Sequence, residues 1–358
     1  MPDQNDIFEA LSQVQDPDLH RDIVSLGMIR NLTIDKGSVS FDFVLTTPAC
    51  PVRDQLQEEA RQAVLGVPGV TQVAVNMKSE TYKDSRMGQL ELPNIKNIIA
   101  VASGKGGVGK STVAVNLAAT LARLGARVGL LDADFYGPNQ PQMLGIDRAA
   151  LIPDENNKMT PPENFGVKLM SLGFFLEGDN PVMWRGPMLH GALTQFLHDV
   201  KWGETDYLVI DLPPGTGDVQ ITLVQNVPLT GCVIVTTPQT VALSDVRKTI
   251  RMFEKAKTNV LGVIENMSGF MCPHCQKSTK IFTEGGGETL QKDYQVELLG
   301  QIPLDGEICR LAEKGAPISA SNPDHPVSKI YETIAKRLAA KISTLNAKAP
   351  LELKIVQS

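Results

Sequence analysis

An α/β fold, with a mainly parallel sheet flanked by helices and a smaller α/β domain before it, is predicted by three observations. Near-continuous apolar runs recur from residue 98 onward, and such runs are typical of strands buried on both faces. These runs alternate with stretches of helical periodicity, as in a parallel sheet covered by helices. A glycine-rich stretch separates the first run from the first helical stretch. The strands are expected at residues 98–102, 128–131, 167–172, 207–212, 233–237, 260–264 and 298–302.

The glycine-rich stretch, residues 104–112, lies where a buried strand is expected to turn into a helix. Consecutive glycines let several backbone N–H groups point at one anion, in front of the positive helix end. The stretch fits the triphosphate pattern G-x-x-x-x-G-K-[ST] and also the dinucleotide pattern G-x-G-x-x-G. Lys110 and Ser111 favour a triphosphate, because only that pattern uses a lysine for the outer phosphates and a hydroxyl for Mg²⁺. The sequence therefore predicts a P-loop NTPase, with a loop of Gly104, Lys105, Gly106, Gly107, Val108, Gly109, Lys110, Ser111 and Thr112.

Length, composition and charge narrow the class of protein. The chain has 358 residues, of which 42% are apolar, so it can form two domains with sizeable cores. A net charge of −6 without a long basic run argues against a nucleic-acid-binding surface. The chain opens without a charged-then-apolar leader, and no apolar stretch is long enough to span a bilayer. We therefore expect a cytoplasmic protein that binds neither nucleic acid nor membrane.

A small α/β unit is expected first in the chain, with helices near residues 7–14 and 52–65. Its strands are expected at residues 32–34, 39–45 and 70–75. Cys50 stands before the second helix, where the helix dipole favours a thiolate, but it equally suits a small residue in a proline-rigidified turn. The expected divisions are the unit at residues 1–78, a polar linker at 79–94, the nucleotide-binding domain at 95–345 and a tail at 346–358.

Acidic residues end two of the strands expected in the second domain. Asp132 and Asp134 follow one apolar run, and Asp211 ends another. Ligand loops lie at the carboxyl ends of parallel strands, so these acids are expected near the phosphate loop. One carboxylate can join the Mg²⁺ shell while another orients an attacking water. Asp132 or Asp211 alone also fits a helix cap, but together with the loop the acids indicate nucleotide hydrolysis.

The lysine directly after the first loop glycine, Lys105, together with Lys110 resembles the deviant phosphate loop of the MinD, ParA and nitrogenase-iron-protein class of ATPases. In that class the first lysine reaches across a nucleotide-sandwich dimer to the partner's phosphates. The resemblance implies a homodimer in which Lys105 and Lys110 are catalytic and Asp134 orients the water. It further implies Asp211 in the Mg²⁺ shell with Ser111, and Asn266 and the backbone around Pro303 beside the adenine.

Five cysteines, an odd number, do not indicate a disulfide framework, and two of them form the close pair Cys272 and Cys275. A redox dithiol of this spacing normally opens a helix after a strand, which residues 276–279 do not resemble. A closed zinc site needs four ligands; the chain has no second close pair, and His274 is a weak candidate. Two such pairs in a twofold dimer supply the four thiolates that a [4Fe-4S] cluster requires.

Over nearly its whole length the chain resembles the Mrp/ApbC family of iron-sulfur cluster carriers. The motifs that carry this resemblance are residues 104–112, 132–138, 183–188 and 211–218, and Cys272 with Cys275. The first domain is similar to a small iron-sulfur-assembly domain often fused to the front of these proteins. The resemblance implies an ATPase that uses ATP and Mg²⁺, holds a transferable [4Fe-4S] cluster between two subunits and passes it to apo iron-sulfur proteins, alongside cluster-assembly proteins.

Two alternatives remain open at this point. A positioning ATPase of the MinD or ParA type works on membranes or DNA, but residues 351–358 form too short and too weakly charged a tail to favour it. A regulatory ATPase whose cysteines hold a structural zinc is the other. Cys232 and Cys309 are expected to be buried small residues in either case. The stretch Trp184-Arg185-Gly186-Pro187 is typical of the family but receives no role.

Overall fold

A computed structural model describes residues 2–348 except 89–91, 93, 136, 147, 148, 150, 176–185, 273, 274, 276, 280 and 283–285. The chain divides into two compact units, unit 1 (Met1–Tyr82 and Ala339–Ser358) and unit 2 (Lys83–Leu338). The division falls after Tyr82 and within helix α11 (Pro326–Lys348), whereas the sequence predicted boundaries after residues 78, 94 and 345.

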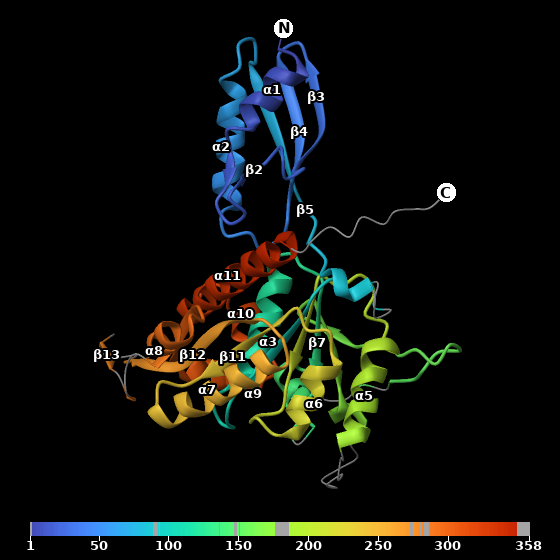
Figure 1. Ribbon diagram of the computed structural model, residues 1–358, viewed down its shortest axis with the longest axis vertical. Helices are drawn as coiled ribbons and strands as arrows, with labels where there is room; N and C mark the ends of the chain where they lie inside the picture. The colour runs from blue at the N-terminus through green and yellow to red at the C-terminus, as the bar shows by residue number, and fades with distance from the viewer. Residues whose placement is uncertain are drawn as a thin grey trace. The chain divides into compact units, whose positions relative to one another are not determined.

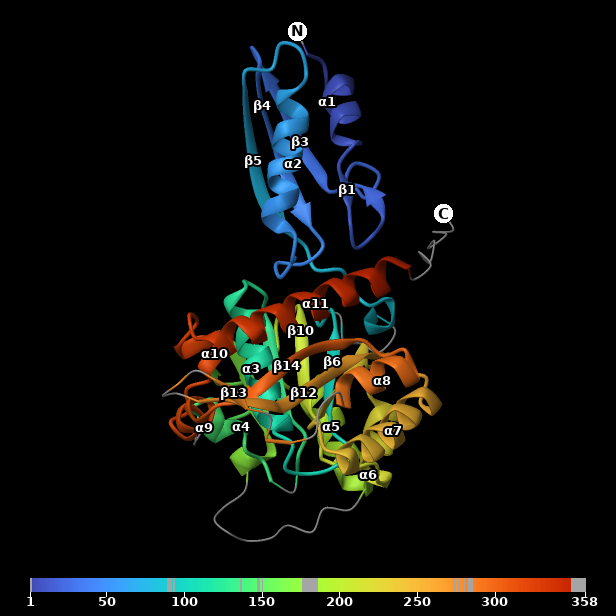
Figure 2. The same cartoon turned by 90° about the vertical axis from the view of Figure 1, so that its left-hand side faces the viewer.

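Unit 1 contains a three-stranded sheet with one face covered by helices. Its elements are α1 (Gln4–Leu11), β1 (Gln15–Asp16), β2 (Arg21–Asp22), β3 (Ile29–Asp35), β4 (Ser38–Leu45), α2 (Arg53–Leu65) and β5 (Gln72–Ser79). The central β4 pairs antiparallel with β3 and parallel with β5. Alternate β4 side chains, from Val39 to Leu45, are buried in one core with Ile7 of α1 and Leu56 of α2. Figure 2 shows α2 in front of β4 and β5.

Unit 2 contains a sheet with nine strands among the described residues. The strands are β6 (Ile98–Ala102), β7 (Val128–Asp132), β8 (Glu163–Asn164), β9 (Val167–Ser171), β10 (Tyr207–Asp211), β11 (Gly231–Thr236), β12 (Val260–Met271), β13 (Ser278–Thr279) and β14 (Leu298–Leu304). Their order is β13-β12-β11-β6-β10-β7-β9-β8, with β14 paired to β12. Pairing is parallel except between β12 and β13 and between β8 and β9. The predicted, mainly parallel sheet is confirmed.

Helices cover both faces of this sheet. They are α3 (Lys110–Arg123), α4 (Gln140–Met143), α5 (Gly186–His198), α6 (Asp218–Asn226), α7 (Thr240–Lys255), α8 (Gly286–Tyr294), α9 (Gly306–Glu313), α10 (Ile318–Ser321) and most of α11, with 3₁₀ turns η1 (Ser85–Gly88) and η2 (Leu172–Phe175). Figure 2 shows α3 and α10 on one side of the sheet and α6, α7 and α8 on the other, while Figure 1 shows the same elements from a second direction. The strands are therefore buried on both faces, as their apolar sequences require.

The strand register brings polar residues together at the carboxyl edge of this sheet. Asp211, the last residue of β10, lies opposite Asp132 at the end of β7, and Asp132 lies opposite Ser171 at the end of β9. After β6 the chain passes to β7 and β9 on one side of β6, and later to β11 and β12 on the other. Loops that leave neighbouring strands in opposite directions leave a crevice between them, where ligands bind in such folds.

Two expectations about unit 2 are wrong. A strand was expected only at residues 260–264, but β12 continues to Met271 and pairs with β13. The strand is irregular there, with a register shift after Asn266 and a positive φ of 55° at Met267, which explains its loop-like sequence. Cys309 was expected to be buried, yet it is exposed on α9, where its neighbour Ile308 faces the core.

The expectation for Cys232 is confirmed: it is buried in β11, and burial raises the pKa of its thiol well above the ordinary value.

At the amino edge of the sheet, Asp206 ties the start of β10 to the residues before β6 and β7. Its carboxylate accepts hydrogen bonds from Arg127 Nη2 at 2.9 Å and Nε at 3.0 Å, and it pairs with Lys96 Nζ at 3.0 Å. Burial by itself would raise the pKa of Asp206, but the hydrogen bonds from Arg127 and Lys96 outweigh it and lower the pKa to about 2.

We predict that Asp206→Asn destabilises unit 2 by about 2 kcal/mol at pH 7, because the buried carboxylate loses its charged hydrogen bonds with Arg127 and Lys96. A folded-state pKa below the unfolded value stabilises the protein above the unfolded pKa, near 4, and this stabilisation is lost as pH falls towards 2. The difference between wild type and variant should therefore be full above about pH 5 and shrink below about pH 4. Urea unfolding followed by tryptophan fluorescence measures it, since both tryptophans lie within Lys83–Leu338. A control, Asp199→Asn, breaks a more exposed pair with Lys158 and should cost less than about 1 kcal/mol; equal losses would contradict the argument.

Candidate functional site: a phosphate loop and a cysteine hairpin

The loop between β6 and α3 has the close contacts that explain its glycines. Gly109 has a φ of +81°, and a Cβ there would lie 2.3 Å from Asn266 Nδ2. A Cβ on Gly104 would lie 2.6 Å from the carbonyl carbon of Asp245 in α7. The predicted loop therefore packs closely against β12 at Gly109 and against α7 at Gly104, directly before α3 begins.

Lys110, the loop's second lysine, is buried between two acids. Its Nζ lies 2.6 Å from Asp211 Oδ1 and 3.4 Å from Asp134 Oδ2, and it donates to Ser111 Oγ at 3.2 Å. Lys110 and Asp211 are 5% and 1% exposed, so each needs the other's charge. The structure therefore brings together Lys110, Ser111, Asp134 and Asp211, as the sequence predicted.

Asp132 lies beside this cluster and accepts hydrogen bonds that order the residues around it. It accepts hydrogen bonds from Ser171 Oγ at 3.0 Å and from the backbone N–H groups of Gln140 and Asp134, each at 3.2 Å. Burial, followed by the charge of Asp211, raises the pKa of Asp132, while these hydrogen bonds oppose the rise. Asp132 thus holds the loop that carries Asp134 onto the end of β7.

Gln140 was not identified from the sequence. It is the first residue of α4, is fully buried, and its Nε2 donates to Asp211 Oδ2 at 2.8 Å and to the carbonyl of Ser111 at 3.0 Å. No motif includes it, and its partners lie 71 and 29 residues away in the chain. Ser171, which hydrogen-bonds Asp132, was missed for the same reason.

The remaining loop and adenine-side residues lie as follows. Lys105 is half-buried, Ser103 Oγ donates to its carbonyl at 2.9 Å, and among the described residues its side chain forms no ion pair. Asn266 Nδ2 donates to the carbonyl of Val108 in the loop at 2.9 Å. Pro303 lies on β14, next to the residue that faces Asn266 across the strand pair.

Cys272 and Cys275 lie in the connection between β12 and β13. Cys272 follows the last residue of β12 and its N–H donates to the carbonyl of Lys277 at 3.1 Å, so the segment turns back as a hairpin. Cys272 is half-buried and Cys275 is exposed. Among the described residues, the next element after Cys275 is strand β13 and not a helix, which argues against a thioredoxin-like dithiol. His274 lies outside the described residues, as do Trp184 and Arg185.

The start of α8 is attached to the same strand by a buried carboxylate that the sequence did not point to. Glu265 is 1% exposed; it accepts from the N–H of Gly287 at 2.7 Å and from Gln301 Nε2 at 2.9 Å. A Cβ on Gly287 would lie 2.6 Å from Leu298 Cδ1, so the helix packs closely there. β12 is therefore joined to the chain on both sides of the two cysteines: Cys272 follows its last residue, and Glu265 binds the start of α8.

Within the described residues, no group of three or more histidine, cysteine, aspartate and glutamate side chains is arranged to hold a metal ion. In unit 1, Cys50 is half-buried and follows β4 ahead of α2. The described part of the chain contains no helix both long and apolar enough to cross a membrane.

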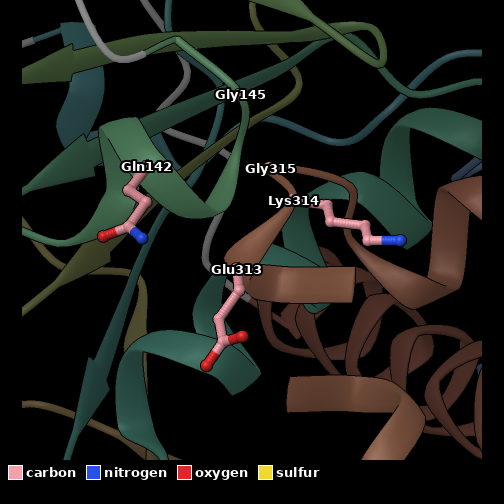
Figure 3. A pocket seen from close by; sticks show the side chains of 5 residues that line it. All are labelled: Gln142, Gly145, Glu313, Lys314 and Gly315. Atoms are coloured by element: carbon pink, nitrogen blue, oxygen red, sulfur yellow. The ribbon is translucent and has the colours of Figure 1, made fainter. Parts of the chain in front are cut away.

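A separate hollow of about 330 Å³ lies between the ends of α4 and α9. It is lined by Gln142, Gly145, Glu313, Lys314 and Gly315. In Figure 3 the three longer side chains point in different directions and do not converge on one ligand. The two glycines touch: a Cβ on Gly315 would lie 2.4 Å from Gly145 Cα. This hollow includes no residue of the phosphate loop and therefore does not extend the site.

Two side chains of the site, Ser111 and Asp211, fit Mg²⁺. The Ser111 hydroxyl and the Asp211 carboxylate are hard oxygen donors of the kind this ion prefers, and they come from adjoining elements linked through Lys110 and Gln140. Parallel sheet, glycine loop, buried lysine and strand-end acids together define a P-loop NTPase.

Comparison with known proteins identifies the family. Residues 94–339 match the model of the NUBPL iron-transfer P-loop NTPases, and residues 4–75 match that of the iron-sulfur cluster assembly proteins. The chain belongs to the Mrp/ApbC/NUBPL family of iron-sulfur cluster carrier P-loop NTPases, with an N-terminal iron-sulfur-assembly domain.

Relatives match almost the whole chain. An iron-sulfur cluster carrier protein from Synechocystis is 48% identical over 94% of this chain and 97% of its own length. One from Deinococcus radiodurans is 49% identical over 94% and 95%, and one from Escherichia coli K12 is 40% identical over 93% and 90%.

Solved structures resemble unit 2. A nucleotide-binding protein from Archaeoglobus fulgidus, in complex with ADP, is 40% identical over 67% of this chain and 94% of its own, with a TM-score of 0.59. The cell division ATPase MinD from Pyrococcus furiosus is 22% identical over 67% and 97%, with a TM-score of 0.51, and supports the fold alone.

We predict that Gly109→Ala destabilises the nucleotide-free protein by about 1–3 kcal/mol, because alanine is strained at a positive φ and its Cβ would meet Asn266. Gly106→Ala is the matched control, since a Cβ there meets nothing within 4 Å. It should leave the melting temperature unchanged or slightly higher. Thermal unfolding by tryptophan fluorescence compares the two. Equal destabilisation would mean that the close contact at Gly109 does not determine the loop.

Proposed function

We propose that the chain is an ATP-hydrolysing carrier that binds a [4Fe-4S] cluster as cargo between two copies of itself and passes it to apo iron-sulfur proteins. One observation carries this proposal: the cysteine hairpin directly continues β12, the strand whose Asn266 touches the phosphate loop. Family membership supports the cargo, and the named relatives are cluster carriers.

The nucleotide site supplies the ATPase part. Backbone N–H groups of residues 104–112 bind the phosphates, Ser111 and Asp211 hold Mg²⁺, and Asp134 orients the attacking water. Mg²⁺ held by these residues would supply positive charge to the phosphate oxygens as negative charge moves among them during hydrolysis. Lys110 exchanges its ion pairs with Asp211 and Asp134 for contacts with the outer phosphates, so it remains paired to anions. Asn266 and the backbone at Pro303 line the adenine side.

The dimer follows from two separate features. Lys105 makes no ion pair with the described residues of its own chain and is assigned to the phosphates bound by the partner. Cys272 and Cys275 supply two thiolates per chain, and a twofold dimer supplies the four that one [4Fe-4S] cluster takes. Nucleotide binding and cargo binding then both depend on the same association.

Transfer requires recipients, and we propose apo iron-sulfur proteins and cluster-assembly proteins as partners. Unit 1, which belongs to the iron-sulfur-assembly domains, provides Cys50 as an accessory thiol for this step. The cytoplasmic location, without nucleic acid or membrane as partner, stays a prediction; some relatives are named as chloroplastic proteins of Arabidopsis thaliana and rice.

We predict that a Cys272→Ser, Cys275→Ser double variant fails to take up a [4Fe-4S] cluster on anaerobic reconstitution with iron and sulfide, because a serine hydroxyl is a poor cluster ligand. Optical and Mössbauer spectra measure the cluster. Cys309→Ser, which removes an exposed cysteine outside the hairpin, should reconstitute as wild type does. A full cluster in the double variant would contradict the assignment. One zinc per subunit and no iron, after anaerobic purification, would favour a structural zinc site.

We predict that Lys105→Gln abolishes most ATP hydrolysis and the ATP-dependent tightening of the dimer, because the partner's phosphates lose a cation that acts in trans. Phosphate release and analytical ultracentrifugation with and without ATP measure the two effects. Lys314→Gln, which alters an exposed lysine of the hollow in Figure 3, serves as the control and should behave as wild type. Unchanged hydrolysis in Lys105→Gln would remove the basis for a nucleotide-sandwich dimer.

A further inference from the structure

The side-chain amide of Gln140 has a fixed orientation, and one of its two polar atoms has no hydrogen-bond partner among the described residues. Its Nε2 carries two hydrogens, and both are used, one by Asp211 Oδ2 at 2.8 Å and one by the Ser111 carbonyl at 3.0 Å. The opposite amide orientation would place an oxygen against these two acceptors, so the assignment of nitrogen and oxygen is determined by the contacts.

The other amide atom, Oε1, is buried, and among the described residues no donor lies within hydrogen-bonding distance of it. A buried acceptor without a donor is unfavourable, and native proteins rarely keep one without a reason. The reason is expected in what the site binds, because Gln140 contacts both Ser111 and Asp211, the two residues assigned to Mg²⁺.

The chemistry of the site limits which group can donate a hydrogen bond to Gln140 Oε1. Phosphate oxygens of ATP are acceptors, so they cannot satisfy an amide oxygen. Lys110 Nζ is directed to carboxylates here and to phosphates when nucleotide binds. Mg²⁺ keeps several of its waters in protein sites, and a metal-bound water is a strong donor.

We propose that Gln140 is a positioning residue of the Mg²⁺·ATP site: its Oε1 accepts a hydrogen bond from a magnesium-bound water while its Nε2 holds Asp211. This inference rests on the nucleotide site proposed above and adds a residue that neither the loop motif nor the strand-end acids include. Because one Asp211 oxygen is held by Gln140, the other, now paired with Lys110, is the one left for the metal.

The test is the Mg²⁺ dependence of ATP binding, measured with a fluorescent ATP analogue in Mg²⁺ and in EDTA. Gln140→Met keeps the side-chain length but removes the acceptor, and it should reduce the Mg²⁺-dependent tightening by about tenfold while metal-free affinity stays within about twofold. Gln140→Glu keeps an acceptor oxygen and, buried against Asp211, shares a proton with it that replaces the Nε2 donor, so this variant should retain that tightening. Gln142→Met, on the same short helix but exposed, is the matched control and should match wild type.

Three results would overturn the inference. They are an unchanged Mg²⁺ effect in Gln140→Met, an equal loss of affinity in Mg²⁺ and in EDTA, or a Gln140→Glu variant that loses the Mg²⁺ effect. If Gln140→Met does not fold, Gln140→Glu alone decides, by keeping or losing the effect. A wild-type protein that binds no ATP under either condition would overturn the proposed ATPase site itself, whereas normal wild-type binding with an unaffected Gln140→Met overturns only the role of Gln140.

Discussion

The arrangement of the nucleotide site depends on the buried ion pair between Lys110 Nζ and Asp211 Oδ1, 2.6 Å apart. The pair connects the start of α3 to the end of β10 across the crevice of the sheet, where neither charge is solvated. Removing one partner would leave an uncompensated buried charge, so the two must remain balanced as ligand enters. ATP with Mg²⁺ meets this condition, because it offers an anion to the lysine and a cation to the aspartate.

Around this pair, the acids differ in role because their surroundings differ. Asp134 is 3.4 Å from Lys110 and remains partly accessible, which suits contact with a water. Asp132, by contrast, already accepts hydrogen bonds from Ser171 and from two backbone N–H groups, and burial disfavours its charged form. The two carboxylates stand two residues apart in the sequence, yet the end of the strand separates a structural acid from a candidate catalytic one.

Much of the fold could be predicted because buried parallel strands have a simple signature, and each of the seven expected strands has a counterpart in the sheet. Residues tied to a motif, such as Lys110 and Asp211, were also predictable. Gln140 and Glu265 were not, since their roles come from contacts with residues far away in the chain. The extension of β12 to Met271 was missed because the strand is irregular after Asn266.

The irregular half of β12 gives a physical reason for the proposed nucleotide site and the proposed cargo site to influence each other. Glu265 and Asn266 are neighbours on this strand; Asn266 contacts the loop carbonyl of Val108, and Glu265 holds the first turn of α8. Cys272 begins where the strand ends. A shift of the phosphate loop would therefore act on β12 through Asn266, because β12 is joined directly to Cys272 and, through Glu265, to the start of α8. Because the register already shifts between Asn266 and Phe270, displacement there disturbs fewer ladder hydrogen bonds than in a regular strand.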